Sequence, residues 1–193
     1  MATLLALSRI RPMAVACARR CASSTVVDRF TLLEVERRFD IDERHLTQRY
    51  KALMSNSHPD RHGCSGAAVQ QQAADHAAEL TDAYRVLRSP HSRAVHLLEL
   101  LGAPLNEETG GDLLGAGFLM QVMEVREELE EAGTQPARLQ ALRAANDVAV
   151  GELHVLLGGA FASQDLEQAR SLTAQLQYLQ RIEDEIHARM PVK

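Results

Sequence analysis

The amino-acid sequence predicts an all-α protein in which an N-terminal helical hairpin is followed by a C-terminal antiparallel three-helix bundle. First, apolar residues recur every three or four positions through most of the chain, which is the spacing of one buried helix face. Second, no stretch of strand length alternates apolar with polar residues. Third, glycine and proline separate the periodic segments, and helices joined by short connections pack antiparallel.

Residues 1–27 have the composition of a mitochondrial transit peptide. They contain four arginines, no acidic residue and many alanines, whereas a secretory signal has a longer uninterrupted apolar centre. A disordered tail is the alternative. Loss of the four arginines would change the formal net charge from −5 to −9, and a protein that acidic is not expected to bind nucleic acid. We therefore expect import into the mitochondrial matrix and partners with basic surfaces.

Residues 30–39 are predicted to form a short helix, and the next two helices are predicted to form the hairpin. The first, residues 42–57, begins at the N-cap Asp42, and its apolar face consists of Leu46, Tyr50, Leu53 and Met54. Pro59 ends it, because proline lacks an N–H and disfavours the helical conformation at the preceding residue. The second, residues 67–88, has an apolar face made of Ala73, Ala77, Leu80, Ala83, Tyr84 and Leu87.

A further helix and a linker are expected before the bundle. Ser89-Pro90 ends the second hairpin helix, Ser92 could cap the next one, and Gly102-Ala103-Pro104 is a strong stop. The following stretch to Gly117 is rich in glycine and polar residues and predicts little structure. The unit that contains the hairpin is therefore expected at residues 28–102, and the linker at residues 103–117.

Three helical patterns occupy residues 118–190. They cover residues 118–132, 136–157 and 165–190, and are separated by Gly133 and by Gly158-Gly159. With about 100° of rotation per residue, the first of them has two apolar surfaces. Its core seam consists of Phe118, Val122, Val125 and Leu129. Leu119, Met120 and Met123 lie on another side, beside Glu124, Glu127 and Glu131. This second surface is expected either to pack against the hairpin unit or to bind a partner, because methionine adapts to a partner's shape and interfaces have apolar centres with polar rims.

The sequence contains no catalytic or cofactor-binding motif. We find no nucleophile beside a base, no phosphate-binding glycine loop and no carboxylate pair spaced for a cleft. His58, His62 and Cys64 suggest a metal cluster only weakly, since no fourth ligand is near, and Cys17 and Cys21 form a lone pair. No apolar run reaches the ~20 residues that span a bilayer. We expect no enzyme activity, no metal, no cofactor and no membrane partner.

His58-Pro59-Asp60 at the hairpin tip, followed by Leu80-Thr81-Asp82-Ala83-Tyr84-Arg85-Val86-Leu87, resembles the J-domain of DnaJ-type co-chaperones. A third segment of the resemblance is Phe30-Thr31-Leu32-Leu33, which precedes the first long helix. A proline helix stop with an Asx turn would also explain the tripeptide alone. The resemblance therefore depends on the second segment, residues 80–87, and on its distance along the chain from the tripeptide.

The resemblance to a J-domain implies that the hairpin binds a DnaK-type heat-shock chaperone and stimulates its ATP hydrolysis. Asp60 would offer a carboxylate to an arginine of the ATPase, and His58 and Pro59 would fix the turn. The basic residues expected to face the chaperone's acidic surface are Arg49, Lys51 and Arg61, with further basic character at Arg44 and Arg85. The sequence departs from the pattern at Ser57, where many J-domains have tyrosine, and at the neutral Met54, Ser55 and Asn56. Chaperone docking is therefore expected to be weaker or specialised.

Phe118-Leu119-Met120-x-x-Met123-Glu124-x-Arg126-Glu127-Glu128-Leu129 resembles the scaffold-binding helix of the HscB-type J-proteins, which are iron–sulfur cluster co-chaperones. Ser89-Pro90-x-x-Arg93-Ala94-x-x-Leu97-Leu98 is also similar to that family, and the likeness covers residues 28 to about 190. It implies that the bundle binds the iron–sulfur cluster scaffold protein through Leu119, Met120, Met123, Glu124, Glu127 and Tyr178. Tyr178 also lies about 90° from the core arc of its own helix, which consists of Leu172, Leu176, Leu179 and Ile186.

Two other interpretations remain open from the sequence. One is a general or import-linked J-protein whose bundle binds unfolded chains. The other is a helical adaptor in which His58-Pro59-Asp60 is only a helix stop. A chaperone ATPase assay separates the adaptor from both J-protein interpretations.

Overall fold

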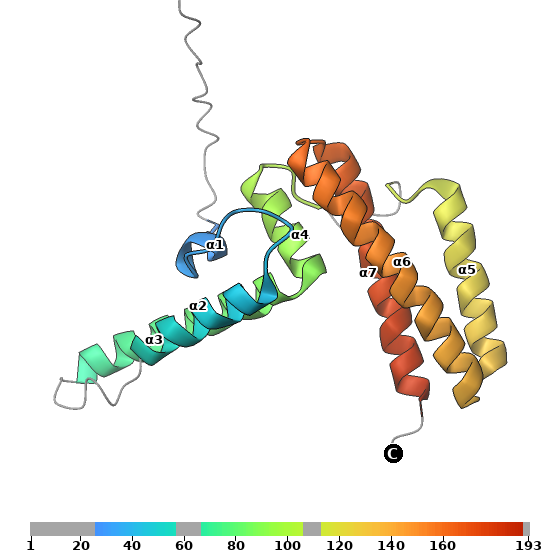
Figure 1. Cartoon of the computed structure of the whole chain (residues 1–193), viewed down its shortest axis with the longest axis horizontal. Coiled ribbons are helices and arrows are strands. Elements are labelled where there is room, and N and C mark those ends of the chain that lie inside the picture. Colours follow the sequence, from blue (N-terminus) through green and yellow to red (C-terminus); the bar gives the residue numbers. More distant parts are fainter. Residues whose placement is uncertain (1–25, 57–66, 106–112, 191–193) are drawn as a thin grey trace, which may run out of the picture.

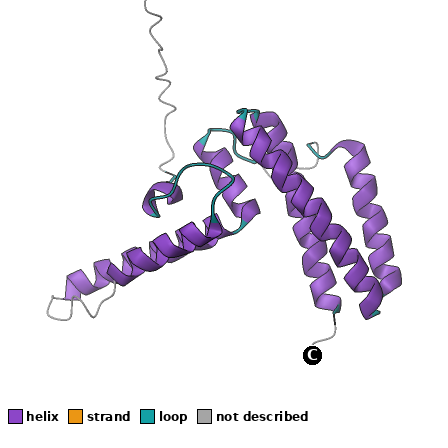
Figure 2. Cartoon of the chain, viewed as in Figure 1, coloured by secondary structure: helices purple, strands orange, loops and turns teal. Residues whose placement is uncertain are grey.

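The computed structural model describes residues 26–56, 67–105 and 113–190 of the chain, and every regular element in these ranges is an α-helix (Figures 1 and 2). The predicted fold class is therefore confirmed. The seven helices of these ranges are α1 (Arg29–Leu32), α2 (Glu43–Asn56), α3 (Ala67–Arg88), α4 (Pro90–Leu100), α5 (Gly115–Ala132), α6 (Pro136–Ala162) and α7 (Leu166–Arg189). None of these helices is long and apolar enough to cross a membrane.

The helix predicted at residues 30–39 is wrong in its length. α1 contains only four residues, and the Asp28 carboxylate caps it by accepting a hydrogen bond from the Phe30 N–H at 3.0 Å. Glu34 then adopts a positive φ of 53°, which a helix does not permit. The chain turns away so that Phe39 can stack on Phe161 of α6, with ring centroids 5.6 Å apart. The contact of Phe39 with α6 therefore prevails over the helix that the local sequence pattern predicts for residues 30–39.

α2 and α3 form the predicted hairpin. The Asp42 carboxylate caps α2 by accepting the Arg44 N–H at 2.8 Å, and α3 has the predicted bounds. The inner faces bury leucine and alanine side chains, and two tyrosines stack between the helices with ring centroids 4.3 Å apart. The residues that make these contacts are Leu46, Tyr50, Leu80, Ala83, Tyr84 and Leu87.

α4 connects the hairpin to the bundle and packs against both α3 and α7. Its N-cap is Ser89 and not Ser92 as predicted: the Ser89 hydroxyl accepts the Ser92 N–H at 3.4 Å. Pro90 then occupies the first helical position, where its missing N–H has no helical partner to lose. One helix therefore contributes to the cores of both units.

The bundle begins earlier than predicted, because α5 starts at Gly115 within the expected linker. Leu114 is buried, and the Ser171 hydroxyl of α7 donates a hydrogen bond to the Leu113 carbonyl at 2.7 Å. These contacts hold the end of the connection against α7. The other part of the expected linker, residues 106–112, lies outside the described ranges.

α6 is longer than predicted, because it continues through Gly158 and Gly159 to Ala162. A glycine inside a helix costs about 1 kcal/mol relative to alanine. Beyond the pair, however, Ala160 is buried and Phe161 stacks on Phe39. Burial of these side chains outweighs the local cost, and the helix ends only where Gln164 takes a positive φ of 59°.

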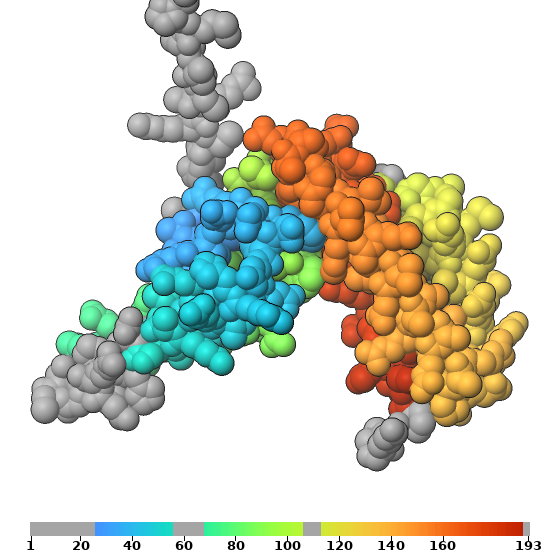
Figure 3. Space-filling model, viewed as in Figure 1, coloured from blue at the N-terminus to red at the C-terminus, as the bar shows by residue number. Residues whose placement is uncertain are grey.

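The three bundle helices lie side by side, with α6 packed along α7 and α5 against both (Figure 1). The hairpin unit docks on the α6–α7 side through α4 and Phe39, and α5 lies on the far side of the bundle. The molecule thus has two arms that diverge from the junction, and Figure 3 shows their surfaces. Surfaces on the hairpin and on α5 are therefore both open to binding partners at the same time.

Candidate functional site

Of the six residues predicted to bind a chaperone, the structure describes Arg49 and Lys51. His58, Pro59, Asp60 and Arg61 lie outside the described ranges. Arg49 is partly buried and forms an ion pair with Glu34 of the α1–α2 connection, whereas Lys51 is exposed. Residues two apart on a helix do not share a face, so Arg49 and Lys51 are directed to different sides of α2.

Arg44 and Lys51, unlike Arg49 and Lys51, lie on the same side of α2. They are seven residues apart, which is close to two helical turns, and both are exposed. The helical spacing was available in the sequence, but the involvement of Arg49 with Glu34 is a tertiary contact that the sequence does not signal. The other basic residue considered, Arg85, lies on α3 and pairs with Asp82 at 2.7 Å.

Hydrogen bonds between the two hairpin helices hold the arm that leads toward the tip. The Thr47 hydroxyl lies 3.1 Å from the Tyr84 hydroxyl, and the Tyr50 hydroxyl lies 3.3 Å from that of Thr81. These contacts surround the stacked tyrosine rings. Stacking and cross-helix hydrogen bonds therefore fix α2 relative to α3.

The base of the hairpin is joined to α4 through Arg29 and His96. The Arg29 backbone N–H donates to His96 Nε2 at 3.2 Å, and the Arg29 guanidinium forms an ion pair with Asp82 at 3.1 Å. His96 is 2% exposed and stacks on Phe30. The other ring nitrogen, Nδ1, lies 3.3 Å from the Arg29 guanidinium and 3.5 Å from the Glu99 carboxylate. Burial, followed by the charge of Arg29, lowers the pKa of His96, which favours the neutral ring.

The predicted scaffold-binding residues of α5 form an exposed apolar patch. Leu119, Met120 and Met123 are 37%, 62% and 62% exposed. Glu124 and Glu127 are exposed one turn beyond the two methionines. The core seam points the other way: Val122 and Leu129 are buried, and Phe118 and Val125 pack against the core. Because α5 is on the far side of the bundle from the hairpin (Figure 1), the alternative that this patch packs against the hairpin unit is wrong.

Tyr178 lies at the boundary between the core and the surface. Its ring meets Phe118 edge to face, with centroids 6.4 Å apart, and the Arg181 guanidinium lies 5.5 Å from its centre. The side chain is half-buried against the core. The structure thus brings Tyr178 of α7 beside the start of α5, but this tyrosine also contributes to packing.

Ion pairs hold α5 and α6 in place beside their neighbours. Arg126 of α5 lies 3.6 Å from Glu185 of α7, and Arg143 of α6 lies 3.0 Å from Glu183 of α7. Partly exposed pairs of this kind contribute about 0–1 kcal/mol each. They therefore add little to the packing of the three helices.

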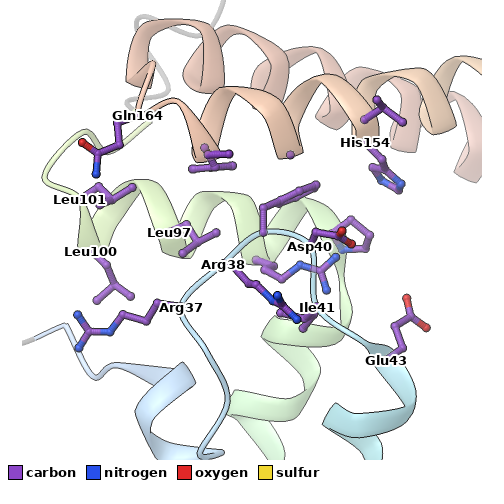
Figure 4. Close-up of a pocket in the computed structure, with 17 residues that line it drawn as sticks. Arg37, Arg38, Asp40, Ile41, Glu43, Leu97, Leu100, Leu101, His154 and Gln164 are labelled. Carbon is purple, nitrogen blue, oxygen red and sulfur yellow. The ribbon is translucent and has the colours of Figure 1, made fainter.

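The junction of the two units contains a cavity of about 850 Å³ that sequence reasoning missed (Figure 4). Arg93 of α4 lines it, with its guanidinium 5.1 Å from the centre of the Phe39 ring and one Nη donating to the Leu87 carbonyl at 3.0 Å. His154 of α6 also lines the cavity, and burial, followed by the charge of Arg93, lowers its pKa. Because contributions from α4, α6 and the α1–α2 connection meet here, no local pattern could have revealed it.

Among residues 26–56, 67–105 and 113–190, no three metal-binding side chains come together. The possible cluster considered from the sequence, His58, His62 and Cys64, lies outside these ranges, as do Cys17 and Cys21.

Comparisons with known proteins point to one family. A family model described as the HSCB C-terminal oligomerisation domain matches residues 115–187. A protein of Cupriavidus taiwanensis called co-chaperone protein HscB homolog is 37% identical over 158 residues, which is 81% of this chain and 89% of the relative. The crystal structure of human co-chaperone protein HscB covers 94% of this chain and 91% of its own, with a TM-score of 0.78 and 27% identity. The structure of chaperone HscB from Vibrio cholerae covers 83% and 96%, with a TM-score of 0.74 and 28% identity.

Proposed function

This chain belongs to the HscB family of co-chaperones, and we propose that it brings an iron–sulfur cluster scaffold protein to a DnaK-type heat-shock chaperone and stimulates the chaperone's ATP hydrolysis. The observation that carries the proposal is the exposed patch of Leu119, Met120 and Met123 on the helix farthest from the hairpin. One arm can bind the chaperone while the other holds the client.

The packed junction supports a coupling of the two binding events. With both partners on one molecule, the second encounter is intramolecular, and its effective concentration can reach the millimolar range. Stacking of Phe39 on Phe161 and packing of α4 on α7 limit the separation of the arms. Two moderate affinities are then sufficient for client delivery.

On the chaperone side, the proposed roles follow the J-domain pattern. Asp60 offers a carboxylate to an arginine of the ATPase, His58 and Pro59 hold the turn, and Arg61 and Lys51 attract an acidic surface. Arg49 belongs to this set only if it exchanges its partner Glu34 for the chaperone. The α2–α3 pair supports this proposal because stacked tyrosine rings and a cross-helix hydrogen bond hold the two described helices together.

On the scaffold side, Leu119, Met120 and Met123 form the apolar centre and Glu124 and Glu127 form the acidic rim. Tyr178 extends the surface onto α7. Exposed methionines beside carboxylates suit a partner with an apolar hollow edged by basic residues.

The proposed organisation has a transit peptide at residues 1–27, a J-domain at residues 28–102, a connection at residues 103–114 and a scaffold-binding bundle at residues 115–190, with the last boundary moved to the observed start of α5. Localisation to the mitochondrial matrix follows from the composition of the first segment. The protein is a stimulator of its partner's chemistry and performs none itself, in keeping with relatives that are named co-chaperones.

The decisive experiment measures chaperone ATP hydrolysis with the purified chain and the purified scaffold. Asp60→Asn should remove stimulation, while Asp75→Asn, an exposed control on α3, should retain it. No stimulation by the unmodified chain would favour the adaptor interpretation. Full stimulation by Asp60→Asn would refute the J-domain role proposed for His58-Pro59-Asp60. Stimulation without capture of the scaffold from mitochondrial extract would favour a general J-protein.

A further inference from the structure

The cavity at the junction of the hairpin unit and the bundle contains a buried guanidinium with an unused donor. Arg93 is 6% exposed, and its Nη1 donates to the Leu87 carbonyl at 3.0 Å. Its Nε is buried and has no hydrogen-bond partner among the described residues. Buried polar groups in folded proteins are almost always hydrogen-bonded. The Nε–H of Arg93 is therefore available to an acceptor that enters the cavity.

His154 of α6 presents a second buried polar atom to this cavity. Its Nε2 also has no hydrogen-bond partner among the described residues. Both groups lie beside the Phe39 ring, whose centre is 5.1 Å from the Arg93 guanidinium and 6.1 Å from the His154 ring centre. A neutral histidine carries one N–H. With that proton on Nε2, the cavity has hydrogen-bond donors from both α4 and α6.

The charges that line the cavity fit a ligand with one negative charge. They comprise three arginines and two acids, a balance of one positive charge: Arg37, Arg38, Arg93, Asp40 and Glu43. Arg37 and Arg38 already form ion pairs with carboxylates of their own segment. Asp40 and Glu43 are exposed, and neither accepts a hydrogen bond from Arg93 Nε. Nε and Nη2 of a guanidinium form a two-donor edge that matches the two oxygens of a carboxylate, so Arg93 is suited to a carboxylate group.

Much of the remaining cavity wall is apolar. Leu97 and Leu100 of α4 and Phe161 of α6 contribute to it, and Figure 4 shows side chains of α4, α6 and the α1–α2 connection around the same space. Leu101 and Val155 also line the cavity, although they are 48% and 77% exposed. The volume of about 850 Å³ lies in the range of roughly 300–1,000 Å³ that is usual for small-molecule sites. A carboxylate on the guanidinium would therefore leave apolar wall for an aliphatic body.

We propose that the junction cavity binds a small amphipathic carboxylate of the medium-chain fatty acid type, with its head on the Nε edge of Arg93 and its chain along the apolar wall. Such a ligand would contact α4, α6 and the α1–α2 connection at once, and it would strengthen the docking of the hairpin unit on the bundle. None of the described residues proposed to bind the chaperone or the scaffold lines the cavity. The ligand site therefore does not depend on the proposed function.

Titration calorimetry of the full chain with decanoate, kept below its micelle concentration, tests the binding. The dissociation constant should be about 10–500 μM. Decan-1-ol should bind at least tenfold more weakly, because it cannot make charge-assisted hydrogen bonds to Arg93. Acetate should show no measurable binding, because it has no apolar body. No binding of decanoate up to about 1 mM, or equal affinities for decanoate and decan-1-ol, would overturn the proposal.

A matched pair of substitutions on α6 locates the site without disturbing the core. Val155→Asp places a carboxylate on the cavity wall and should weaken decanoate binding at least tenfold through repulsion. Val148→Asp adds the same charge about two turns away, at a position that is 63% exposed and does not line the cavity, and should bind decanoate normally. Equal affinities of the two variants for decanoate would show that the ligand lies elsewhere.

Arg93→Lys tests the head group. Lysine retains the charge but not the two-donor edge, so decanoate should bind at least tenfold more weakly while the affinity for decan-1-ol should not change. An unchanged affinity for decanoate in a variant that thermal melts show to be folded would contradict the role of Arg93.

Glu43→Gln tests the site without altering a buried residue, because Glu43 is exposed. Removal of this neighbouring carboxylate should strengthen decanoate binding. If the unmodified chain does not bind decanoate and Glu43→Gln does, then Glu43 itself is the partner of Arg93 and the proposal is wrong.

Discussion

Replacing Met120 and Met123 by alanine should separate binding from stability. Each side chain is 62% exposed, so only about two fifths of its surface is buried in the bundle. Full burial of a methionine stabilises a fold by about 1.5–3 kcal/mol. The double variant should therefore lose no more than about 2 kcal/mol of the free energy of unfolding, partly offset by the high helix propensity of alanine.

Scaffold binding should respond far more strongly to this double substitution. If both methionines are central anchors, each truncation costs about 2 kcal/mol or more. The dissociation constant should then rise about 30-fold for one substitution and up to about 1,000-fold for two. Titration calorimetry with the purified scaffold measures this change, and chemical denaturation of the same samples measures stability.

The matched control is Gln121→Ala with Glu128→Ala, which truncates two exposed side chains on another side of α5. It should bind the scaffold normally. Normal binding by the methionine variant would refute the site assignment, and so would an equal loss in the control. Tyr178→Ala is not a clean test, because loss of its contact with Phe118 lowers stability as well as affinity.

Four further predictions concern other parts of the molecule. Reversal of Glu124 and Glu127 to lysine should slow scaffold association and remove much of its salt dependence, whereas a salt dependence equal to that of the unmodified chain in stopped-flow measurements would contradict the acidic rim. Gly159→Ala should stabilise the chain by about 0.5–1 kcal/mol in denaturation experiments, because the position is helical, is exposed and has space for a Cβ; destabilisation would show that the space is needed. The free energy of unfolding should fall as the pH is lowered from about 7.5 to about 5.5, because the lowered pKa of His96 means that the folded state binds fewer protons than the unfolded state below the ordinary value of 6.5; His96→Gln should reduce this slope, and an unchanged slope would contradict a neutral buried ring. Removal of residues 1–27 should leave the melting temperature and both binding activities unchanged but prevent accumulation in mitochondria, and imaging that still shows mitochondrial accumulation would place the signal elsewhere.

The bounds of α2, α3 and α7 and the end of α5 followed closely from local patterns. Helical spacing, the Asp42 cap and the stops at Gly102 and Gly133 all act within one or two turns, so they can be read from neighbouring residues. The same reasoning separated the two faces of α5. Met120 and Met123 are exposed and Leu129 is buried, as the angles around that helix predicted.

Predictions failed where a distant contact competes with a local preference. Residues 33–39 could continue a helix, but Phe39 gains more by stacking on Phe161. The glycines at 158 and 159 could end α6, but burial of Ala160 and Phe161 extends it. In both places the burial of an aromatic ring, worth about 1.5–3 kcal/mol, exceeds a backbone preference of about 1 kcal/mol.

The sequence by itself determined the helices, their buried faces and the residue types of the proposed binding surfaces, because helical periodicity and capping are local. Only the tertiary structure decided the pairing of Arg49 with Glu34, the half-burial of Tyr178 and the cavity beside Arg93. It also decided that the patch on α5 is exposed on a helix remote from the hairpin, whereas the angles around one helix left that open. Each of these depends on which helices meet in space, and that choice is made by summed burial over the whole chain.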